Sequence, residues 1–588
     1  MSASYVHSPT QKLQESSGIT GSPAGPQSES VPHRLRSLLS LAAFLLAAGA
    51  FSIIYCFLYL KQNPHTGLVY LLLLHALVLP ALIWYWRVSR NHVRSFGFLR
   101  RYLFTAVAFS LLVVSVGLSA RNGRLIVDES AYRFQAKVFT AGKLKAAPMF
   151  GVQRDIRRTP EEIFFVHTLQ TPGGWYAKYP PAWPLVLALG YLLHCSWLIN
   201  PLCGIVQLFL IWWLARPWGQ VTQVLAVVIA ATSAYMLISN VGYMSHPFES
   251  VIALLAIGAL IKGVQTARLQ WVAVCFLLVI LAIQVRLYTG AVIGALCAGI
   301  LFFEFKSKRR LLLGAFSIAF VAALVSVGLY LAENHLYTGN ALLSPYSLYR
   351  GGQNVDEFTL NPIRIFSELH IWRSALAETA RVTFPFLFLF ALYACWKQES
   401  NKRFLIYLAL LFPLLVISYV VDPAPSGSFD GERFYYEGFC LLAIVAARGF
   451  DLLVKNWHVN SRSVNVALAV LIAIQVPTIV FTVKDIRQAL RLYNQAYDLS
   501  LGTPTKPLVF LSTYPARFAS KQVNWNDANW QQAQVVFLND PGSSRRDSVA
   551  CTFGRPSYRL IQFDPKRNRM VGSDALANCS SAQHSLPE

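Results

Sequence analysis

Long apolar runs separated by short charged loops dominate this sequence of 588 residues. Hydrophobic residues make up 55% of the chain and charged residues only 13%, whereas a soluble domain usually carries about 25% charged residues. Because a charge at the centre of a bilayer costs several kcal/mol, segments that cross lipid exclude charged side chains. The pattern therefore predicts an all-α polytopic integral membrane protein.

Apolar runs long enough to approach the ~20 residues of a membrane span recur along the chain. The candidate spans are 37–60, 67–86, 102–120, 182–198, 202–215, 221–240, 247–261, 270–285, 289–304, 311–332, 379–396, 404–421, 436–453 and 463–482. The segment 182–198 follows Pro180-Pro181 and breaks the alternation of inner and outer loops, so we expect it to be re-entrant or interfacial. About thirteen transmembrane helices then remain.

The orientation follows from Lys and Arg, which concentrate on the cytoplasmic side of membrane proteins. Basic clusters lie in the loops 87–101, 305–310, 397–403 and 448–462. Placing these loops inside puts the N-terminus in the cytoplasm and the segments 121–181, 241–246, 286–288, 333–378, 422–435 and 483–588 outside. The net charge of +23 then reflects these loops and contact with anionic membrane lipids, and it does not indicate a nucleic-acid partner.

Three regions of different composition divide the chain. Residues 1–33 are rich in Ser, Gly, Pro and Gln and are expected to form a disordered cytoplasmic tail. Residues 34–482 form the predicted transmembrane domain. Residues 483–588 are predicted to form a small soluble α/β domain outside the membrane. We expect short strands there, at 508–511, 535–538 and 558–562, and Cys551 and Cys579 can form a disulfide if the compartment is oxidising.

Two adjacent carboxylates, Asp128 and Glu129, lie in the outer loop 121–181, close to the end of a predicted span. From Tyr132 onward the pattern is amphipathic, with Tyr132, Ala136 and Phe139 on one face, which predicts a helix along the membrane interface. A carboxylate at this position can take a proton from a hydroxyl while a lipid-borne substrate stays in the bilayer. The alternative is that both residues only cap the helix.

Several stretches in this order resemble the GT-C glycosyltransferases, above all the dolichyl-phosphate-mannose protein mannosyltransferases and the bacterial lipid A aminoarabinose transferases. The resemblance covers residues 120–450, and each motif is individually loose. It rests on Asp128-Glu129 followed by Tyr132, Ala136 and Gly142, on Tyr179-Pro180-Pro181 and Pro184, on Tyr337-Thr338-Gly339-Asn340 with Ser344-Pro345-Tyr346, and on Gly431-Glu432-Arg433-Phe434-Tyr435-Tyr436-Glu437. About two predicted spans precede the usual start of that family's core, which is a departure from the pattern.

The resemblance implies a GT-C-like fold and an inverting glycosyltransferase that moves a hexosyl or pentosyl group from a polyprenyl-phosphate donor to a hydroxyl of a lipid, a cell-envelope glycan or a protein. In that family an outer-loop Asp is the catalytic base, which implies this role for Asp128, and Glu129 occupies the second position of the pair.

A departing lipid phosphate needs nearby cations. The outer-face candidates are Lys178, Arg286, Arg350 and Arg433. Alternatives are that Arg286 only extends to the headgroups and that Arg433 forms a surface ion pair.

Further substrate-binding candidates lie in the outer segments or, like Glu249, at the outer start of a predicted span. They are Tyr179, His246, Glu249 and Tyr346. For His246 and Glu249 the alternative is a role at the start of a helix.

We expect no cofactor. The His residues are scattered without metal-ligand spacing, so no metal site is predicted, although a divalent cation held by Asp128 and Glu129 remains open. A secondary transporter or flippase is the alternative function, but the internal repeats typical of transporters are not seen. A scaffold without activity is a third alternative. The expected location is a bacterial inner membrane, with the active site facing the periplasm.

Overall fold

The computed structural model describes most of the chain beyond residue 126. The described residues are 127–149, 167–349, 369–419, 433–459, 461–501, 507–512 and 524–579. The tail 1–33, the predicted spans 37–60, 67–86 and 102–120, and the candidate residue Arg350 lie outside them.

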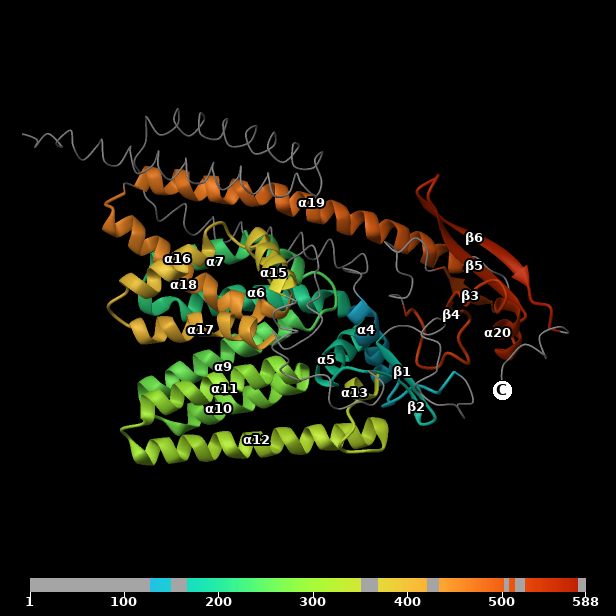
Figure 1. Ribbon diagram of the computed structural model, residues 1–588, viewed down its shortest axis with the longest axis horizontal. Coiled ribbons are helices and arrows are strands. Elements are labelled where there is room, and N and C mark those ends of the chain that lie inside the picture. Colours follow the sequence, from blue (N-terminus) through green and yellow to red (C-terminus); the bar gives the residue numbers. More distant parts are fainter. Residues whose placement is uncertain are drawn as a thin grey trace, which may run out of the picture.

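The described chain is mainly helical, and its helices lie side by side in a bundle (Figure 1). Five of the described helices are long and apolar enough to cross a membrane. They are η2 (Ser196–Leu198) joined to α6 (Ile199–Leu214), α9 (His246–Thr266), α11 (Leu287–Phe305), α12 (Arg309–Thr338) and the segment Ser463–Val480 within α19 (Ser461–Leu501). The chain is therefore a multi-pass membrane protein.

Other predicted spans are shorter or broken. The remaining helices of the bundle are α5 (Ala182–Leu192), α7 (Gln220–Ala231), α8 (Ala234–Ser239), α10 (Leu269–Val285), α15 (Leu369–Val382), α16 (Leu387–Lys397), α17 (Lys402–Ser418) and α18 (Tyr436–Asn456). Helix α5 has 11 residues and is about 16 Å long, half of the ~30 Å hydrocarbon core. This length agrees with the expectation that 182–198 does not cross the membrane by itself. The total number of spans stays a prediction.

Two helix breaks replace predicted continuous spans, and they face each other. The predicted span 221–240 is divided into α7 and α8, and the predicted span 379–396 is bent by 88° between α15 and α16. Ser233 Oγ, at the first break, donates a hydrogen bond to the carbonyl of Val382 at the second (2.9 Å). Gln475 of α19 donates to the Thr383 carbonyl (2.8 Å). Backbone groups released inside a membrane protein must find such partners.

Helix α18 lies at the centre of the bundle, packed by α7, α9, α16 and α17. It is buried almost all round from Tyr436 to Ala447, as expected for a helix that is apolar on every side. Gly449 permits the close approach of α16, since a side chain there would overlap the Phe390 carbonyl. By contrast, α12 lies at the edge, and only 17% of its apolar window is buried within the protein.

A four-stranded mixed sheet follows the bundle. Its strands are β3 (Leu508–Leu511), β4 (Val536–Asn539), β5 (Ser557–Asp564) and β6 (Arg569–Leu576). The order is β4-β3-β5-β6, with β3 parallel to β4 and β5, and β6 antiparallel to β5. The three predicted strands are confirmed, and β6 was missed because its exposed, polar sequence lacks an apolar pattern. The expected domain boundary at residue 482 falls within α19, which is continuous from Ser461 to Leu501.

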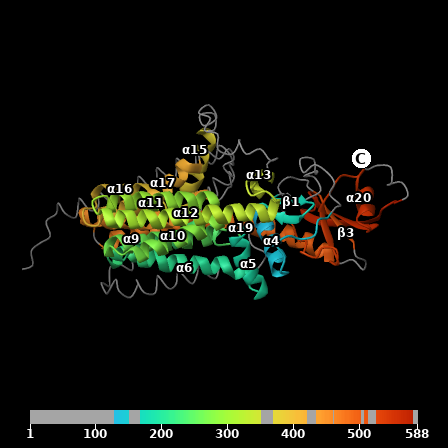
Figure 2. The same cartoon turned by 90° about the horizontal axis from the view of Figure 1, so that it is seen from below.

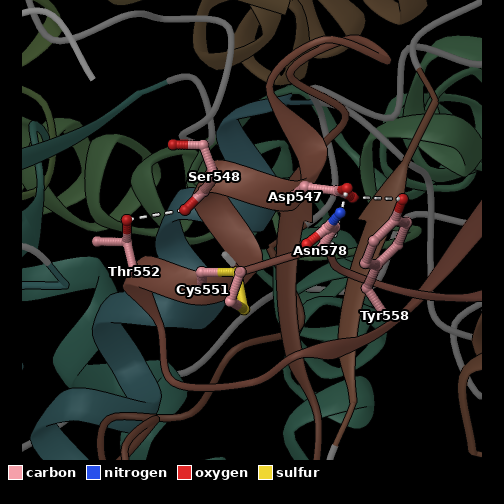
Figure 3. Close-up of a disulfide and its surroundings, with 7 residues drawn as sticks. Asp547, Ser548, Cys551, Thr552, Tyr558 and Asn578 are labelled. Carbon is pink, nitrogen blue, oxygen red and sulfur yellow. Dashed lines mark hydrogen bonds between the residues drawn. A yellow bond between two sulfur atoms is a disulfide. The ribbon is translucent and has the colours of Figure 1, made fainter. Parts of the chain in front are cut away.

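The sheet region contains a disulfide between Cys551, in α20 (Arg546–Thr552), and Cys579 after β6 (Figure 3). Beside it, Asp547 accepts hydrogen bonds from the Tyr558 hydroxyl (3.1 Å) and from the backbone N–H of Asn578 (3.2 Å). The pairing that the sequence left open is therefore made, and disulfides are typical of oxidising compartments.

Helix α4 (Val127–Thr140) lies between the bundle and the sheet (Figures 1 and 2). The predicted face of Tyr132, Ala136 and Phe139 packs on the bundle. The opposite face is also buried, because Phe134 and Val138 share a hydrophobic core with the sheet. The helix is thus enclosed by protein on both faces. It also begins before Tyr132, so Asp128 and Glu129 belong to its first turn.

Polar contacts strengthen this docking. Lys137 Nζ lies 2.7 Å from Asp527 Oδ1, and Trp530 Nε1 donates to the carbonyl of Ala147 (2.9 Å). The sheet region therefore holds the helix that carries the candidate base.

Candidate active site

Asp128 is held by three side chains from separate segments of the chain. Arg433 Nη2, in η5 (Arg433–Tyr435), lies 3.2 Å from Asp128 Oδ2. The Tyr179 hydroxyl donates a hydrogen bond to Oδ1, and His167 Nδ1 lies 3.4 Å from the same oxygen. The Asp128 side chain is only 9% exposed. A residue that merely capped α4 would need none of these partners.

The charge states in this group follow from its contacts. Burial by itself raises the pKa of Asp128, but Arg433, His167 and Tyr179 outweigh it and hold that pKa well below its ordinary value. Burial and then the charge of Asp128 raise the pKa of Tyr179 well above its ordinary value. At neutral pH the carboxylate is therefore ionised and can only accept hydrogen bonds, while the phenol keeps its proton.

A β-hairpin places His167 and Tyr179 side by side. Its strands are β1 (Thr168–Thr171) and β2 (Gly174–Ala177), which pair antiparallel. The pairing continues for one step beyond the strands, because the N–H of Lys178 donates to the His167 carbonyl (3.1 Å). Both side chains consequently emerge at the open end of the hairpin, next to Asp128.

The hairpin is fixed to α4 and to the loop that follows it. Gln135 Oε1 of α4 accepts a hydrogen bond from the N–H of Ala177 (2.9 Å), and Trp175 exchanges two backbone hydrogen bonds with Ala146 (both 2.9 Å). Gly174 allows this approach. Its φ is +135°, and a Cβ there would lie 2.8 Å from the Ala146 carbonyl oxygen. These contacts fix the position of the hairpin relative to Asp128.

A second polar group forms where the ends of five helices meet, namely α9, α10, α11, α17 and α18. Arg286, between α10 and α11, has Nη1 2.6 Å from His246 Nε2, and the same Nη1 lies 3.8 Å from Glu437 Oε1. His246 Nδ1 lies 3.0 Å from that carboxylate oxygen. Arg286 Nη2 donates to the Tyr419 hydroxyl (3.1 Å), which lies 2.6 Å from Thr289 Oγ1. Arg286 is therefore held within the protein and does not simply extend to the headgroups.

Phe434 joins the two groups. Its ring stacks on Tyr419 with 4.7 Å between centroids. The guanidinium of Arg286 lies 5.0 Å from the ring centroid, and that of Arg433 lies 5.2 Å from it. The segment from Arg433 to Glu437 thus contributes to both groups, so they are parts of one site.

Lys178 lies in a cage of aromatic rings. Its Nζ is 4.4 Å from the ring centroids of both Tyr346 and Tyr349, in α13 (Pro345–Tyr349), and 5.3 Å from that of Tyr179. Cation–π attraction stabilises a largely buried ammonium in such a position. The candidates Lys178 and Tyr346 therefore lie beside the Asp128 group. Tyr179 connects them to it, because it contacts both Lys178 and Asp128.

The two other acidic candidates are buried but lie apart from Asp128. Glu129 is within electrostatic reach of Tyr243 and Tyr493. Glu249, in the first turn of α9, is within reach of Glu437 and Arg286. Neither carboxylate oxygen of Glu249 has a hydrogen-bond partner among the described residues. The structure thus brings Glu249 into the second group and places Glu129 elsewhere.

Four residues of the site were not predicted as site residues from the sequence: His167, Tyr419, Phe434 and Glu437. The last two lie in a motif that carried the family resemblance, which is the signal that could have found them. His167 is one of the scattered histidines, whose spacing indicates no site. Within the described ranges, no group of three or more His, Cys, Asp or Glu residues is arranged to hold a metal ion.

Known proteins resemble this chain in structure and not in sequence. No protein-family model matches the chain, and no curated protein matches its sequence. Among solved structures, the chain is similar to ArnT from Cupriavidus metallidurans bound to undecaprenyl phosphate, with a TM-score of 0.53 and 12% identity over 82% of this chain and 99% of that one. The apo state of the same protein gives a TM-score of 0.50 and 13% identity with the same coverage.

A weaker likeness connects the chain with the Archaeoglobus fulgidus oligosaccharyltransferase tethered to an acceptor peptide, with a TM-score of 0.46 and 12% identity over 79% of this chain and 69% of that one. At 12% and 13% identity, the likeness to the two ArnT structures concerns the fold alone. It confirms the resemblance drawn from the motifs: the chain has a GT-C-like fold.

Proposed function

We propose that this protein is an inverting glycosyltransferase that moves a hexosyl or pentosyl group from a polyprenyl-phosphate donor to a hydroxyl acceptor on the outer face of the membrane. The observation that carries the proposal is the position of Asp128. Its buried carboxylate lies beside Arg433, and through Phe434 it is connected to Arg286. The similar fold of ArnT, seen with undecaprenyl phosphate bound, supports a lipid-phosphate donor.

In the proposed reaction, the acceptor hydroxyl attacks the anomeric carbon from the side opposite the phosphate. The new carbon–oxygen bond forms as the bond from the anomeric carbon to the phosphate oxygen breaks. The hydroxyl proton passes to Asp128, and the lipid leaves as polyprenyl phosphate. An ionised carboxylate is required for this step, and the contacts of Asp128 keep it ionised.

The departing phosphate gains negative charge, so fixed cations next to it lower the barrier. Arg286 and Arg433 both lie against Phe434, and Lys178 lies beside Tyr179. We propose that Arg286, Arg433 and Lys178 bind the donor phosphate. Tyr346 would hold Lys178 in position through its ring. His246 orients Arg286 through the contact described above. Glu249 would contact the sugar, and Glu129 has a supporting role in α4.

We place the protein in a bacterial inner membrane with this site facing the periplasm. The disulfide in the sheet region supports an oxidising compartment for that end of the molecule. The acceptor would be a lipid, a cell-envelope glycan or a protein, and membrane lipids surround the bundle. We propose that no cofactor takes part.

The proposal is tested with membranes that contain wild-type protein, Asp128→Asn or Asp498→Asn. Asp498 is exposed in α19 and is the matched control for the substitution. A panel of radiolabelled polyprenyl-phosphate hexoses and pentoses is supplied, and label is followed into lipid, glycan and protein fractions. We expect transfer by the wild type and the control and a loss of at least about a hundredfold in Asp128→Asn. Transfer at the wild-type rate by Asp128→Asn would remove Asp128 as the base.

A further inference from the structure

A chain of hydrogen bonds connects His167 with Asp128 through a phenol. The Tyr179 oxygen lies 2.7 Å from His167 Nδ1, and the Tyr179 hydroxyl also contacts Asp128 Oδ1. The rings of His167 and Tyr179 meet edge to face, with 5.7 Å between centroids. His167 is 20% exposed at its side chain, compared with 9% for Asp128.

The directions of these hydrogen bonds follow from the number of protons available. The ionised carboxylate of Asp128 can only accept, so the single proton of Tyr179 is donated to it. The Tyr179 oxygen is then left as an acceptor. The proton between His167 and Tyr179 must therefore come from His167 Nδ1. Burial lowers the pKa of His167, and a neutral ring with its proton on Nδ1 satisfies this arrangement.

The backbone of His167 adopts a conformation that few side chains accept. Its φ is +66°, in the left-handed region, which is sparsely populated by residues other than Gly, Asn, Asp and His. Such a conformation persists where the surroundings fix it, commonly at functional sites. Here the hydrogen bond from the N–H of Lys178 fixes the carbonyl of His167, and the ring of Tyr349 packs edge to face on its imidazole with 5.6 Å between centroids.

We propose that His167 is a positioning residue for Asp128: its Nδ1–H fixes the phenol of Tyr179, which in turn fixes the carboxylate. The consequence for sugar transfer rests on the function proposed above, whereas the positioning itself does not. Without this donor, the Tyr179 oxygen keeps only its hydrogen bond to Asp128, and Asp128 loses part of the hydrogen bonding that keeps it ionised and oriented. The charged or titratable groups around Asp128 are Arg433 from η5, His167 and Tyr179 from the hairpin, with Lys178 behind them, and Tyr132 from α4 itself.

Two substitutions at position 167 distinguish the effect of the hydrogen-bond donor from that of the backbone conformation. In His167→Asn the amide nitrogen is bonded to Cγ, as Nδ1 is in histidine, and asparagine accepts a positive φ. His167→Gly accepts the same backbone but has no donor. Tyr179→Phe removes the middle of the chain. His335→Gly, at an exposed position in α12, controls for a His-to-Gly change in the same protein.

The first readout does not depend on activity. The infrared stretch of the protonated Asp128 carboxyl, assigned by its disappearance in Asp128→Asn, is titrated in the purified full-length protein. We expect its midpoint to rise in His167→Gly and Tyr179→Phe and to stay at the wild-type value in His167→Asn. Equal midpoints in wild type and His167→Gly would overturn the proposal.

The second readout is the rate of sugar transfer as a function of pH. We expect His167→Gly and Tyr179→Phe to lose about tenfold to a hundredfold in kcat/KM. We also expect the acidic limb of their pH–rate profiles to move to higher pH. His167→Asn should retain most of the activity. The losses in His167→Gly and Tyr179→Phe should not add fully in the double variant His167→Gly/Tyr179→Phe, because both residues act on Asp128. His167→Asn could be as slow as His167→Gly although its Asp128 carboxyl titrates at the wild-type midpoint. In that case His167 does not affect transfer by positioning Asp128. If the wild type transfers no sugar, the proposed function fails, and the infrared titration still decides the positioning.

Discussion

Arg433 Nη2 lies 3.2 Å from Asp128 Oδ2, although the two residues are far apart in the sequence. Arg433 begins the short turn that leads into α18, the central helix of the bundle, and Asp128 lies in the first turn of α4. The contact therefore links the centre of the membrane region to the helix held by the sheet. Because both charges are largely buried, removing one takes an ion-pair partner from the other and is expected to be destabilising.

Replacing Arg433 with Gln should shift the pH dependence of transfer. The pKa of Asp128 is depressed in the folded protein, so activity that needs the ionised form is present above that pKa and is lost as the pH falls through it. An adjacent arginine lowers a carboxyl pKa by about 1–3 units, so Arg433→Gln should move the acidic limb upward by about that amount. Rates measured across the acidic range test this. Arg433→Lys, which keeps the charge, should shift the acidic limb of the pH–rate profile less. An unchanged acidic limb in Arg433→Gln would contradict the assignment of Asp128 as the base that Arg433 keeps ionised.

The sequence predicted Asp128 from its position close to the end of a predicted span, and Arg433 as one of the cations on the outer face. It could not predict that they meet, because the contact depends on how α4 and α18 pack. His167 was missed for a related reason. It reaches Tyr179 only through the register of the β1–β2 hairpin, in which Thr168 pairs with Ala177. Neither strand has a strong apolar alternation from which that pairing could be deduced.

The long spans were predicted well where a helix is continuous, as in α11 and α12. The breaks at Ser233 and between Val382 and Leu387 were not predicted, because hydropathy measures apolar length and not continuity. The local signals are Pro385 in the second break, because proline ends or kinks a helix, and the polar Ser233 at the first. Ser233 and Gln475 read as tolerated polar residues until the structure shows the carbonyls that they satisfy.

Arg286 can be tested in a variant that also removes the carboxylate of its ion-pair partner Glu437. Arg286→Gln alone would leave Glu437 uncompensated, so the informative variant is Arg286→Gln/Glu437→Gln, which removes both charges. We expect it to unfold at a temperature close to the wild type but to lose about a hundredfold to a thousandfold in kcat, as when one transition-state donor is removed. Glu437→Gln serves as the control that keeps Arg286. Wild-type kcat in the double variant would show that Arg286 does not act on the leaving phosphate.

Chelation should leave transfer unchanged. Both carboxylate oxygens of Asp128 already face protein groups, Arg433 on one side and Tyr179 with His167 on the other. Glu129 lies towards Tyr243 and Tyr493, so the two adjacent carboxylates do not converge on one point. We therefore expect equal initial rates before and after treatment with EDTA. A loss of activity that added magnesium or manganese restores would instead indicate a bound divalent ion.

The disulfide should contribute to stability and not to chemistry. Cys551 and Cys579 are separated by 28 residues, and a crosslink that closes such a loop typically stabilises a protein by about 2–4 kcal/mol. Cys551→Ser/Cys579→Ser should lower the unfolding temperature of the sheet region while transfer at low temperature persists. Cys195→Ser, at a free cysteine, is the control. An unchanged unfolding temperature in the double variant would argue that the crosslink adds no stability.

Trp525 offers a test of how the sheet supports the catalytic helix. Its ring meets Tyr493, Tyr497 and Phe537, with 4.6, 5.2 and 5.1 Å between centroids, and its carbonyl accepts a hydrogen bond from Lys137 of α4 (3.2 Å). Truncating a buried tryptophan costs about 3–5 kcal/mol. We therefore expect Trp525→Ala to lower the unfolding temperature and to make transfer fall steeply on warming, because the core that Phe134 and Val138 share with the sheet loosens.

Two variants control for the nature of this change. Trp525→Phe keeps most of the aromatic contact and should lie between Trp525→Ala and the wild type. Trp457→Ala removes a tryptophan that is 54% exposed and should leave both unfolding and transfer as they are. If Trp525→Ala lowers the unfolding temperature but transfer keeps its wild-type temperature dependence below that point, the sheet is a passive neighbour of α4. Parallel losses in Trp525→Ala would instead show that the position of Asp128 depends on the packing of the sheet against its helix.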